Sequence, residues 1–302
     1  MSLLEQYKDF KSGYVAIIGR PNAGKSTLLN RLLDVKLSIV SYRPQTTRKR
    51  VLGILNEDKL QTVFFDTPGM IKPEYEMHKH LMEYVRKSTK EADMVMAMFA
   101  VDKFKGDGRD FLQELDYIKA IKIPVIAVIN KIDQIKKGEI LPIIEYLGKQ
   151  ECFKSIVPIS ALKNDGIEEL KEEFKSYLPY HPPYYDQDVL TEQPERFFAA
   201  EIVRETIFLK YRDEIPYSTE VTIEEFKERP NGKTYIRANI NVERESQKKI
   251  LVGKGASALK DVGQRARKQL EKFLDRPVYL ELFVKVNPNW RNDKNKLKWM
   301  GY

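Results

Sequence analysis

The segment Gly19–Ser26, GRPNAGKS, has the residue types and spacing needed to hold a phosphate chain. It fits the pattern G-x-x-x-x-G-K-[ST] between an apolar run and a helical pattern, and chance would produce it in on the order of one per cent of chains this long. Glycines let backbone N–H groups face the phosphates, Lys25 reaches the β- and γ-phosphates, and the Ser26 hydroxyl can ligate Mg²⁺. The residues expected around the nucleotide here are Gly19, Arg20, Pro21, Asn22, Ala23, Gly24, Lys25, Ser26 and Thr27.

The segment NKID at residues 130–133 predicts which purine this site selects. It ends an apolar strand, where ligand-contacting residues lie in open α/β sheets. The Asp133 carboxylate can accept hydrogen bonds from guanine N1–H and the N2 amino group, whereas adenine would leave a desolvated carboxylate unsatisfied. Lys131 can lay its stem over the base, Asn130 can tie this loop to the first, and the Ala161 N–H can reach guanine O6. The residues expected near the base are Asn130, Lys131, Ile132, Asp133, Ser160, Ala161 and Leu162.

The elements that must hold these loops have the pattern of an α/β domain. Near-continuous apolar runs rich in Val and Ile are typical of strands covered on both faces. They occupy residues 14–19, 60–66, 93–102, 124–130 and 155–160. Amphipathic stretches at 74–92 and 108–121 lie between them. The alternation predicts a mostly parallel sheet with helices on both faces.

The Pro-rich segment 178–188 ends this alternation because it cannot continue a helix. We expect a first domain at 1–180, a linker at 181–191, and a smaller α+β domain with a basic tail at 192–302. The elements expected after the linker are a helix at 195–212, strands at 217–228 and 233–245, a helix at 257–273 and a strand at 277–286. Asn231-Gly232 supplies the residues of a tight hairpin turn between the two strands.

The net charge of +8 is confined to the end of the chain. Residues 248–302 carry 14 Lys and Arg against 5 Asp and Glu. This segment indicates a polyanionic partner, nucleic acid or an anionic membrane surface, unless it is only a solvated face. The single Cys152 excludes an internal disulfide framework and suits a reducing compartment. No secretory signal is visible, and no apolar run approaches the roughly 18–20 residues that span a bilayer.

Within the basic segment, LVGKGASALK at residues 251–260 places two glycines one lysine apart before a helical pattern. Its spacing fits neither a second phosphate loop nor a dinucleotide site. Two interpretations remain, a plain turn or a loop whose bare backbone approaches a nucleic-acid backbone, and the basic surroundings favour the second. The residues expected to contact RNA are Lys248, Lys249, Gly253, Lys254, Gly255, Ala256, Lys260, Arg265, Arg267 and Lys268.

The ordered set GRPNAGKS, QTTRK, DTPG, NKID and SAL resembles the five motifs of translation-factor-class GTPases over residues 14–165. The resemblance implies that Ser26 and Thr47 (favoured over Thr46) ligate Mg²⁺, and that Asp66 holds it through water. It implies that the Gly69 N–H senses the γ-phosphate and that these contacts order two switch loops until hydrolysis. The DTPG segment adds Asp66, Thr67, Pro68, Gly69 and Met70 to the nucleotide site. The implied catalytic set is Lys25, Thr47, Asp66 and Gly69.

Met70 stands where many small GTPases have a glutamine that orients the attacking water. The chain therefore resembles the GTPases with a hydrophobic residue at this position. Hydrolysis should then depend on positioning, Mg²⁺ and a monovalent cation near the phosphates. Asn22 matches the asparagine that holds K⁺ in relatives of that group. We expect slow turnover that is faster in K⁺ than in Na⁺.

Residues 195–285 resemble a KH domain of the bacterial type, in which a GXXG loop clamps about four nucleotides. The fourth loop position is Ala256, and alanine prefers a negative φ, so the resemblance leaves the loop geometry open. A GTPase domain followed by a KH domain resembles the bacterial Era GTPases over nearly the whole chain. This resemblance implies GTP hydrolysis to GDP, a role in assembly of the 30S ribosomal subunit, and binding of single-stranded ribosomal RNA near the 3′ end of the small-subunit RNA. It also implies cytoplasmic residence with peripheral contact to the inner membrane, and we expect a monomer.

Two other functions compete with this one. The first is a membrane-associated signalling GTPase whose basic C-terminal domain binds anionic lipid, which would favour a basic amphipathic helix over a glycine loop. The second is a passive RNA-binding module with a vestigial nucleotide site, against which the complete motif set weighs. Trp290, Trp299 and Tyr302 in the tail either stack on RNA bases or pack against the domain, and packing is favoured for Trp290.

Overall fold

The computed structural model describes residues 7–41, 43–104, 111–230 and 232–302, without the side chains of Leu112 and Gln113. The chain divides into two compact units. The first unit contains the residues up to Lys72 together with Leu81–Glu192, and the second contains Pro73–His80 and Gln193–Tyr302. No helix among the described residues is long and apolar enough to cross a membrane.

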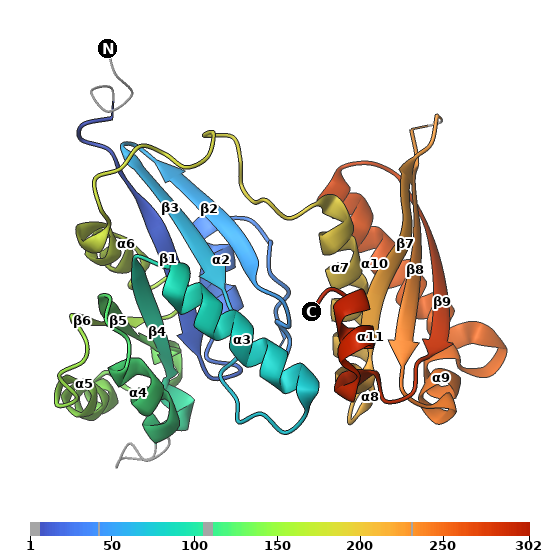
Figure 1. Ribbon diagram of the computed structural model, residues 1–302, viewed down its shortest axis with the longest axis horizontal. Helices are drawn as coiled ribbons and strands as arrows, with labels where there is room; N and C mark the ends of the chain where they lie inside the picture. Colours follow the sequence, from blue (N-terminus) through green and yellow to red (C-terminus); the bar gives the residue numbers. More distant parts are fainter. Residues whose placement is uncertain (1–6, 42, 105–110, 231) are drawn as a thin grey trace. The chain divides into compact units, whose positions relative to one another are not determined.

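The first unit is built on a six-stranded sheet in the order β2-β3-β1-β4-β5-β6 (Figure 1). β2 is antiparallel to β3, and all other neighbours are parallel. The strands are β1 (Lys11–Gly19), β2 (Val51–Glu57), β3 (Leu60–Asp66), β4 (Met94–Ala100), β5 (Val125–Asn130) and β6 (Ser155–Ile159). The helices are α2 (Lys25–Leu33), α3 (Glu76–Glu91), α4 (Leu112–Lys119), α5 (Ile140–Gly148) and α6 (Ile167–Tyr177).

Helices cover both faces of this sheet because successive side chains of a strand point to opposite faces. Phe65 of β3 belongs to a buried cluster that contains residues of α3, α4 and α5. Phe64 points the other way and contacts Phe174 of α6, with ring centroids 5.6 Å apart. Gly53, paired with Phe64 in the register, lies against Leu33 of α2 on that same face. The predicted mostly parallel α/β fold is confirmed.

The carboxyl ends of the parallel strands meet at one edge of the sheet. The register pairs Ile17 with Asp66, Gly19 with Met98, and Asn130 with Ile159. The chain leaves the sheet at this edge for each nucleotide motif, so segments far apart in the sequence converge there. β2, which the sequence patterns did not predict, contains a glycine and ends in polar residues at the edge of the sheet.

The second unit has a three-stranded sheet in the order β7-β8-β9, with β7 antiparallel and β9 parallel to β8. The strands are β7 (Glu220–Glu228), β8 (Thr234–Val242) and β9 (Val278–Val286). The helices are α7 (Glu195–Lys210), α8 (Ile215–Ser218), α9 (Glu245–Val252), α10 (Ser257–Leu274) and α11 (Lys294–Trp299). The predicted α+β arrangement is confirmed. Gly232 has a φ of 73°, as a tight turn requires, while Asn231 lies outside the described residues.

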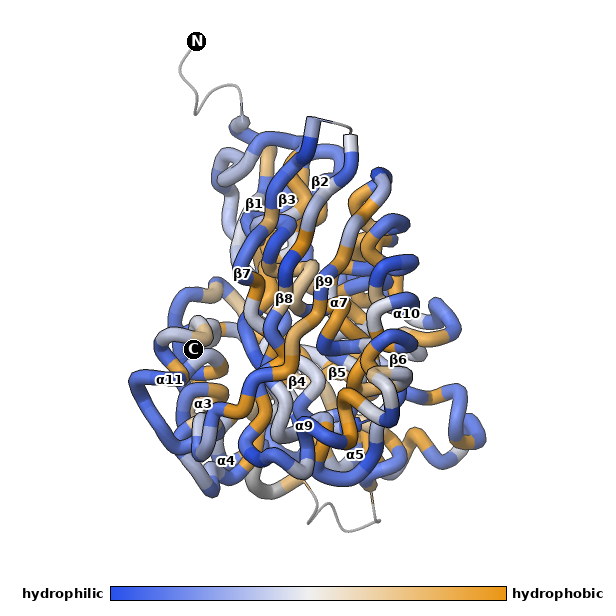
Figure 2. Tube along the Cα trace, turned by 90° about the vertical axis from the view of Figure 1, so that its right-hand side faces the viewer, coloured by the Kyte–Doolittle hydropathy of each residue, from blue (hydrophilic) through white to orange (hydrophobic). Residues whose placement is uncertain are grey.

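The inward residues of β8 and β9 pack against α7, α9 and α10. Val203 and Ile207 of α7, Ile240 of β8 and Val262 of α10 share one buried cluster. In Figure 2 the strands alternate between hydrophobic and hydrophilic residues, as expected for a sheet covered on one face. Opposite charges pair across the strands on the outer face, where Glu224 contacts both Lys285 and Arg237.

Candidate functional site

The phosphate loop between β1 and α2 takes backbone conformations that only glycine adopts without strain. Gly19 and Gly24 have φ values of 145° and 99°. A Cβ atom at Gly24 would lie 2.0 Å from Asn130 Nδ2, and one at Gly19 would lie 2.5 Å from the Met98 carbonyl oxygen. The loop leads directly into the N-terminus of α2, where free N–H groups favour a bound anion.

Lys25 lies almost fully buried inside this loop, with 6% of its surface exposed. Its Nζ donates hydrogen bonds to the carbonyl oxygens of Gly19 at 3.0 Å and Arg20 at 2.9 Å. Burial lowers the pKa of Lys25 to about 8, against the opposing influence of the Asp66 and Glu114 carboxylates. Burial removes the water that would solvate the Lys25 ammonium. A phosphate group bound next to it would supply negative charge in place of that water.

Oxygen atoms from three motifs meet beside the phosphate loop. The Ser26 hydroxyl donates to Asp66 Oδ2 at 2.7 Å and lies 2.8 Å from the Thr47 hydroxyl. Asp66 Oδ1 is buried and has no hydrogen-bond partner among the residues that the structure describes, and burial raises the pKa of this carboxyl. A hard divalent cation satisfies such an oxygen, and Mg²⁺ prefers oxygen ligands. The residues present therefore fit Mg²⁺.

The structure distinguishes the two threonines of QTTR. Thr47 contacts Ser26, whereas the Thr46 hydroxyl donates to the Arg43 carbonyl oxygen at 2.8 Å. Residues of the segment 39–47 line one pocket together with the phosphate loop and Gly69. No motif marks the pocket residues before Thr46, so the sequence did not predict them; they are Ile39, Val40, Ser41, Arg43 and Gln45.

The DTPG segment packs tightly against the phosphate loop. The Thr67 hydroxyl donates to the Ile17 carbonyl oxygen at 2.7 Å, and the Met70 N–H donates to the Gly19 carbonyl oxygen at 2.9 Å. A Cβ atom at Gly69 would lie 2.6 Å from the backbone nitrogen of Pro21. The Met70 side chain is apolar and buried in the core of the unit, so it carries no amide that could orient a water molecule.

The base-selecting residues are connected to the phosphate loop through one amide. Asn130 Nδ2 donates to the Ala23 carbonyl oxygen at 2.8 Å, and Asn130 Oδ1 accepts the Ala161 N–H at 3.0 Å. The Ser160 hydroxyl donates to Asp133 Oδ1 at 2.5 Å. Ser160 is fully buried and Asp133 is exposed, so the serine fixes a carboxylate that faces outward. Sequence reasoning placed Ser160 in the site but missed this orienting contact.

The other predicted base contacts lie around this centre. Lys131 has a φ of 69°, and its Nζ pairs with Asp102 at 3.2 Å. This ion pair ties the end of the lysine side chain to Asp102, two residues after β4 ends. Ile132 is half-buried, and Leu162 is 64% exposed. The structure thus brings the NKID and SAL motifs together at the carboxyl ends of β5 and β6.

In the second unit, the glycine loop joins α9 to α10 through three left-handed residues. Gly253, Gly255 and Ala256 have φ values of 72°, 56° and 61°. A Cβ atom at Gly253 would lie 2.7 Å from the Ala258 Cβ, so the first glycine is required. Ala256 takes the positive φ that a glycine would adopt there, at a cost of roughly 1–2 kcal/mol for an L-residue. The loop thus bends at all three positions despite the alanine.

A groove of about 310 Å³ lies between α10 and β9 at the end of this loop. Its lining combines apolar side chains with two cations, which suits bases and phosphates together. The lining residues are Ala256, Leu259, Lys260, Gly263, Gln264, Arg267, Leu280 and Leu282. Of these, only Ala256, Lys260 and Arg267 were predicted from the sequence, because strand β9 reaches the loop only through folding.

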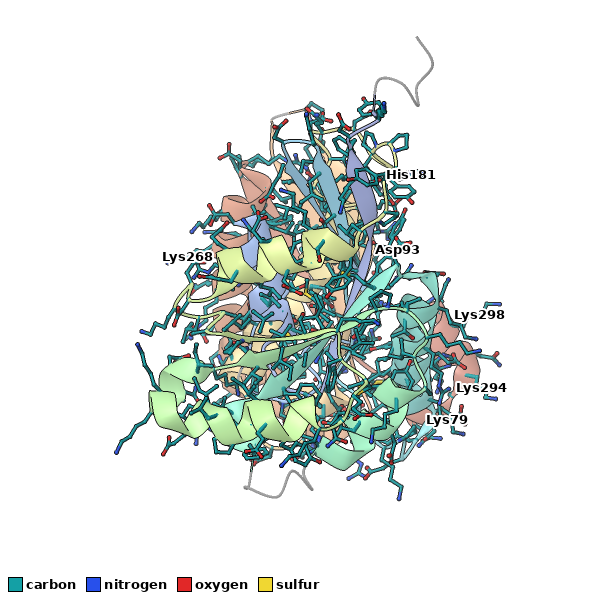
Figure 3. The ribbon with its side chains drawn as sticks, turned by 90° about the vertical axis from the view of Figure 1, so that its left-hand side faces the viewer. Lys79, Asp93, His181, Lys268, Lys294 and Lys298 are labelled. Atoms are coloured by element: carbon teal, nitrogen blue, oxygen red, sulfur yellow. The ribbon has the colours of Figure 1, made fainter. Side chains whose placement is uncertain are left out.

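The remaining predicted cations are spread around the loop. The exposed Arg265 pairs with Asp261 at 3.0 Å within α10. Lys249, Lys254 and Lys268 are exposed, and Lys268 is labelled in Figure 3. Lys248 is half-buried on α9.

The tail aromatic residues differ in burial. Trp290 is fully buried and donates its indole N–H to the Ser218 carbonyl oxygen at 3.0 Å, as its packing role predicts. The Tyr302 hydroxyl donates to Glu220 at 2.6 Å, while Trp299 is 63% exposed on α11. α11 lies away from α10 in both Figure 1 and Figure 2, so Trp299 does not extend the groove.

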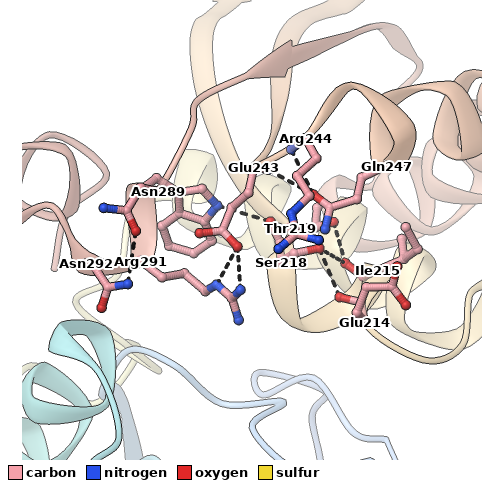
Figure 4. Close-up of polar contacts among 11 residues, drawn as sticks. Glu214, Ile215, Ser218, Thr219, Glu243, Arg244, Gln247, Asn289, Arg291 and Asn292 are labelled. Carbon is pink, nitrogen blue, oxygen red and sulfur yellow. Dashed lines mark hydrogen bonds and ion pairs between the residues drawn. The ribbon is translucent and has the colours of Figure 1, made fainter.

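The tail also fixes the helix that leads into the loop. Arg291 pairs with Glu243, two residues before α9 begins (Figure 4). The Gln247 side chain accepts the N–H groups of Glu243 and Arg244, both at 3.0 Å. These contacts hold the N-terminus of α9 against β8 and so set the position of the glycine loop.

Comparison with known proteins assigns both units. A family model described as 50S ribosome-binding GTPase matches residues 14–131, and a KH domain model matches residues 214–291. The GTPase Era of Geotalea uraniireducens is 45% identical over 295 residues, which cover 98% of this chain and 99% of the relative. This chain belongs to the Era family of GTPases.

The similarity extends to Era proteins of other lineages and to solved structures. A chloroplastic ERA-like GTPase of Oryza sativa is 45% identical, with 97% of this chain and 69% of the relative covered. The crystal structure of Era in complex with MgGDPNP and nucleotides 1506–1542 of 16S ribosomal RNA matches with a TM-score of 0.93 and 42% identity, covering 97% of this chain and 99% of that one. A variant of Aquifex aeolicus Era bound to GDP and AlF4− matches equally well.

Proposed function

We propose that this Era-family chain is a GTP-hydrolysing switch that binds small-subunit ribosomal RNA near its 3′ end and acts in assembly of the 30S subunit. One observation carries the proposal. The same chain holds a guanine-selective site joined through Asn130 and a KH groove lined by Lys260 and Arg267. The Era relative that binds MgGDPNP and a 16S RNA fragment supports both activities. The broad family description names the 50S subunit instead, but 16S RNA belongs to the small subunit.

Hydrolysis follows from positioning. Lys25 and the Gly69 N–H bind the γ-phosphate, and Ser26, Thr47 and Asp66 would hold Mg²⁺, the last through water. Bound Mg²⁺ neutralises charge on the transferring phosphoryl group. Residue 70 is a methionine packed in the core, so no side-chain amide orients the attacking water from this position. We therefore expect a slow intrinsic rate, which suits a timer.

A monovalent cation would add charge stabilisation next to the phosphates. Asn22 lies in the pocket that holds Lys25 and Thr47, with a φ of 64° that bends the loop around this position. We infer that its side-chain oxygen ligates K⁺. Turnover should be several-fold faster in K⁺ than in Na⁺ for the unaltered chain and lose this preference in Asn22→Ala. Equal rates in the two salts would remove this role for Asn22.

The test of the main proposal measures nucleotide and RNA binding in one preparation. GTP should bind at least 100-fold more tightly than ATP, since adenine leaves the Asp133 carboxylate unsatisfied. Binding of a 16S RNA 3′-end fragment should differ among GDPNP, GDP and no nucleotide, and should weaken steeply with salt. Equal affinity for ATP and GTP would refute the guanine site, and RNA affinity independent of nucleotide would refute the switch.

Further proposals concern the domain limits, the oligomeric state, the ribosomal partner and the cellular location. We infer domain limits at 180 and 192, a monomer, association with the 30S subunit itself, and a cytoplasmic location with peripheral contact to the inner membrane. The alternative in which the basic domain binds anionic lipid gains no observation in its favour. The apolar groove beside the left-handed glycine loop suits nucleotides better than a lipid surface.

A further inference from the structure

The segment that follows α6 does not leave the first unit as a free tether. β2 is the edge strand of the sheet, and the hydrogen bonds that join residues 191, 190 and 187 to residues 52, 54 and 56 show that the segment runs antiparallel along it. The Ile54 N–H donates to the Leu190 carbonyl oxygen at 2.8 Å, and the Thr191 hydroxyl donates to the Leu52 carbonyl oxygen at 2.6 Å. Residues 187–191 thereby cover the Ile54 N–H and the Leu52 carbonyl oxygen, two of the backbone groups that an edge strand exposes. We call residues 187–191 the edge segment.

A second anchor lies just upstream of the edge segment, on β3. Gln61 is fully buried, and its Oε1 accepts the N–H groups of Tyr184 at 2.7 Å and Tyr185 at 3.0 Å. Its Nε2 donates to the Tyr185 carbonyl oxygen at 2.8 Å and to Asn56 Oδ1 at 2.7 Å. Three of the four hydrogen bonds of this buried amide therefore hold the chain that leads to the edge segment, and the fourth joins Asn56. The same chain passes His181, visible in Figure 3, whose N–H donates to the Phe10 carbonyl oxygen at 3.1 Å.

The strand that receives the edge segment begins four residues after Thr47, whose hydroxyl lies at the Ser26–Asp66 cluster. The edge segment in turn ends four residues before α7, the first helix of the second unit. A short path thus runs along the chain from the nucleotide pocket to β2, across the hydrogen bonds between β2 and the edge segment, and along the chain to the start of the KH unit. The edge segment is also held by Asn56 Nδ2, which donates to the Gln187 carbonyl oxygen at 2.9 Å, and by Val189, which packs against the core. Leu190 is 45% exposed, so this part of the segment is accessible to solvent and its docking can respond to strain in β2.

We propose that the edge segment is the element that couples nucleotide state to RNA affinity, an inference that rests on the proposed switch. Movement of Thr47 on exchange of GTP for GDP shifts the start of β2. That shift changes how well Leu52 and Ile54 hold Thr191 and Leu190. Docking and release of the edge segment then alter the freedom of the KH unit, and with it RNA affinity.

The test compares Thr191→Val, which removes the hydroxyl at nearly constant volume, with Thr191→Ser, which keeps the donor. Asp188→Asn, an exposed change within the edge segment, is the matched control. Affinity for the 16S 3′-end RNA is measured with GDPNP and with GDP. Loss of one hydrogen bond shifts docking by about tenfold, so the GDPNP-to-GDP ratio of RNA affinities should fall several-fold toward one in Thr191→Val. The ratio should persist in Thr191→Ser and Asp188→Asn, and these two control variants should bind GDPNP with an affinity within about twofold of the unaltered protein.

Amide hydrogen exchange of the unaltered protein gives a second test, which does not depend on whether Thr191→Val folds. The amide protons of Ile54 and Tyr184 should exchange at different rates in the GDPNP and GDP states. Equal exchange in both states, or an unchanged affinity ratio in Thr191→Val, would overturn the coupling role alone. An affinity ratio of one in the unaltered protein would instead overturn the proposed switch, and the coupling with it.

Discussion

The nucleotide site and the RNA groove differ in how their residues are held. The nucleotide residues come from five segments between Gly19 and Leu162, and hydrogen bonds connect them to one another. Lys25, Asp66 and Asn130 are buried, and each contacts another part of the site before any ligand binds. The RNA groove is built mainly from one continuous stretch of chain plus β9, and its cations Lys260 and Arg267 are exposed.

This difference sets how each site should respond to substitution. A preorganised, buried site concentrates its binding energy in a few groups, because losing one leaves its partner unsatisfied. An exposed basic groove spreads its energy over several screened contacts, so each change has a smaller, salt-dependent effect. The comparison predicts steep losses at the first site and shallow ones at the second.

The largest effect should follow Asp133→Asn. The amide retains the shape but presents N–H groups to the guanine N1–H and amino group, so two acceptors become at best one. GDP affinity should fall at least 100-fold, as measured by fluorescent-nucleotide titration. Ser160→Ala, which only frees the Asp133 carboxylate to rotate, should cost about tenfold. If Asp133→Asn lowered GDP affinity less than tenfold, the binding energy would not be concentrated in a few groups of the nucleotide site.

A smaller effect is expected for Lys260→Ala with Arg267→Ala. Removing both groove cations should weaken RNA binding by about 10- to 30-fold at low salt and reduce the salt slope by about two. GDP affinity should not change. Arg265→Ala is the matched control, since Arg265 pairs with Asp261 and lies outside the groove lining, and it should cost less than about twofold. Equal losses in the double variant and the control would mean that general charge, not the groove, binds RNA.

The pH dependence of nucleotide binding tests the role of a buried group, Lys25, at the nucleotide site. With the pKa of Lys25 lowered to about 8, the ligand-free protein loses this proton as the pH rises through that value, and a phosphate group binds the charged form. GDPNP affinity should therefore fall about fourfold between about pH 7 and 8.5. Calorimetry in two buffers should show proton uptake on binding at the higher pH, and its absence would mean that Lys25 stays charged.

The same shift bears on the stability of the ligand-free protein. The unfolded state binds the Lys25 proton up to its ordinary pKa of 10.5, whereas the folded state releases it near 8. Lys25 therefore destabilises the fold at neutral pH, and its contribution to the free energy of unfolding rises as the pH increases from 8 to 10.5.

The smallest effect should come from Ala256→Gly. Glycine removes the strain of a φ of 61° but adds freedom to the unfolded chain, so the free energy of unfolding should rise by no more than about 1 kcal/mol. RNA affinity should stay within about twofold, as measured by thermal unfolding and RNA titration. Ala258→Gly, inside α10, is the control and should destabilise by about 0.5–1 kcal/mol. A large gain in RNA affinity would show that the alanine distorts the loop.

Sequence patterns predicted the nucleotide motifs and both fold classes because these depend on local signals. The phosphate loop, NKID and SAL each stand at the end of an apolar strand, and parallel strands bring such ends together. The periodic helices of the second unit and Gly232 of its hairpin turn are equally local signals. The choice of Thr47 over Thr46 came from the resemblance, and the structure brings Thr47 to Ser26.

The features that sequence reasoning missed depend on long-range contacts. Gln61 looks like an ordinary polar interruption of β3 until its partners Tyr184 and Tyr185, more than 120 residues away, pack beside it. Leu280 and Leu282 are unremarkable strand residues until β9 pairs with β8 and closes the groove. The carboxylate–serine contact at Asp133 likewise arises only when β5 and β6 lie side by side.

The contacts of Asn130 affect how the protein discriminates among nucleotides. One amide holds the phosphate loop through Ala23 and the base loop through Ala161, and a methyl group at Gly24 would collide with it. A triphosphate with an ill-fitting purine would therefore displace the very backbone that cradles its phosphates. Discrimination thus acts on catalytic alignment as well as on affinity, so a wrong nucleotide that does enter should be hydrolysed even more slowly than its weak binding suggests.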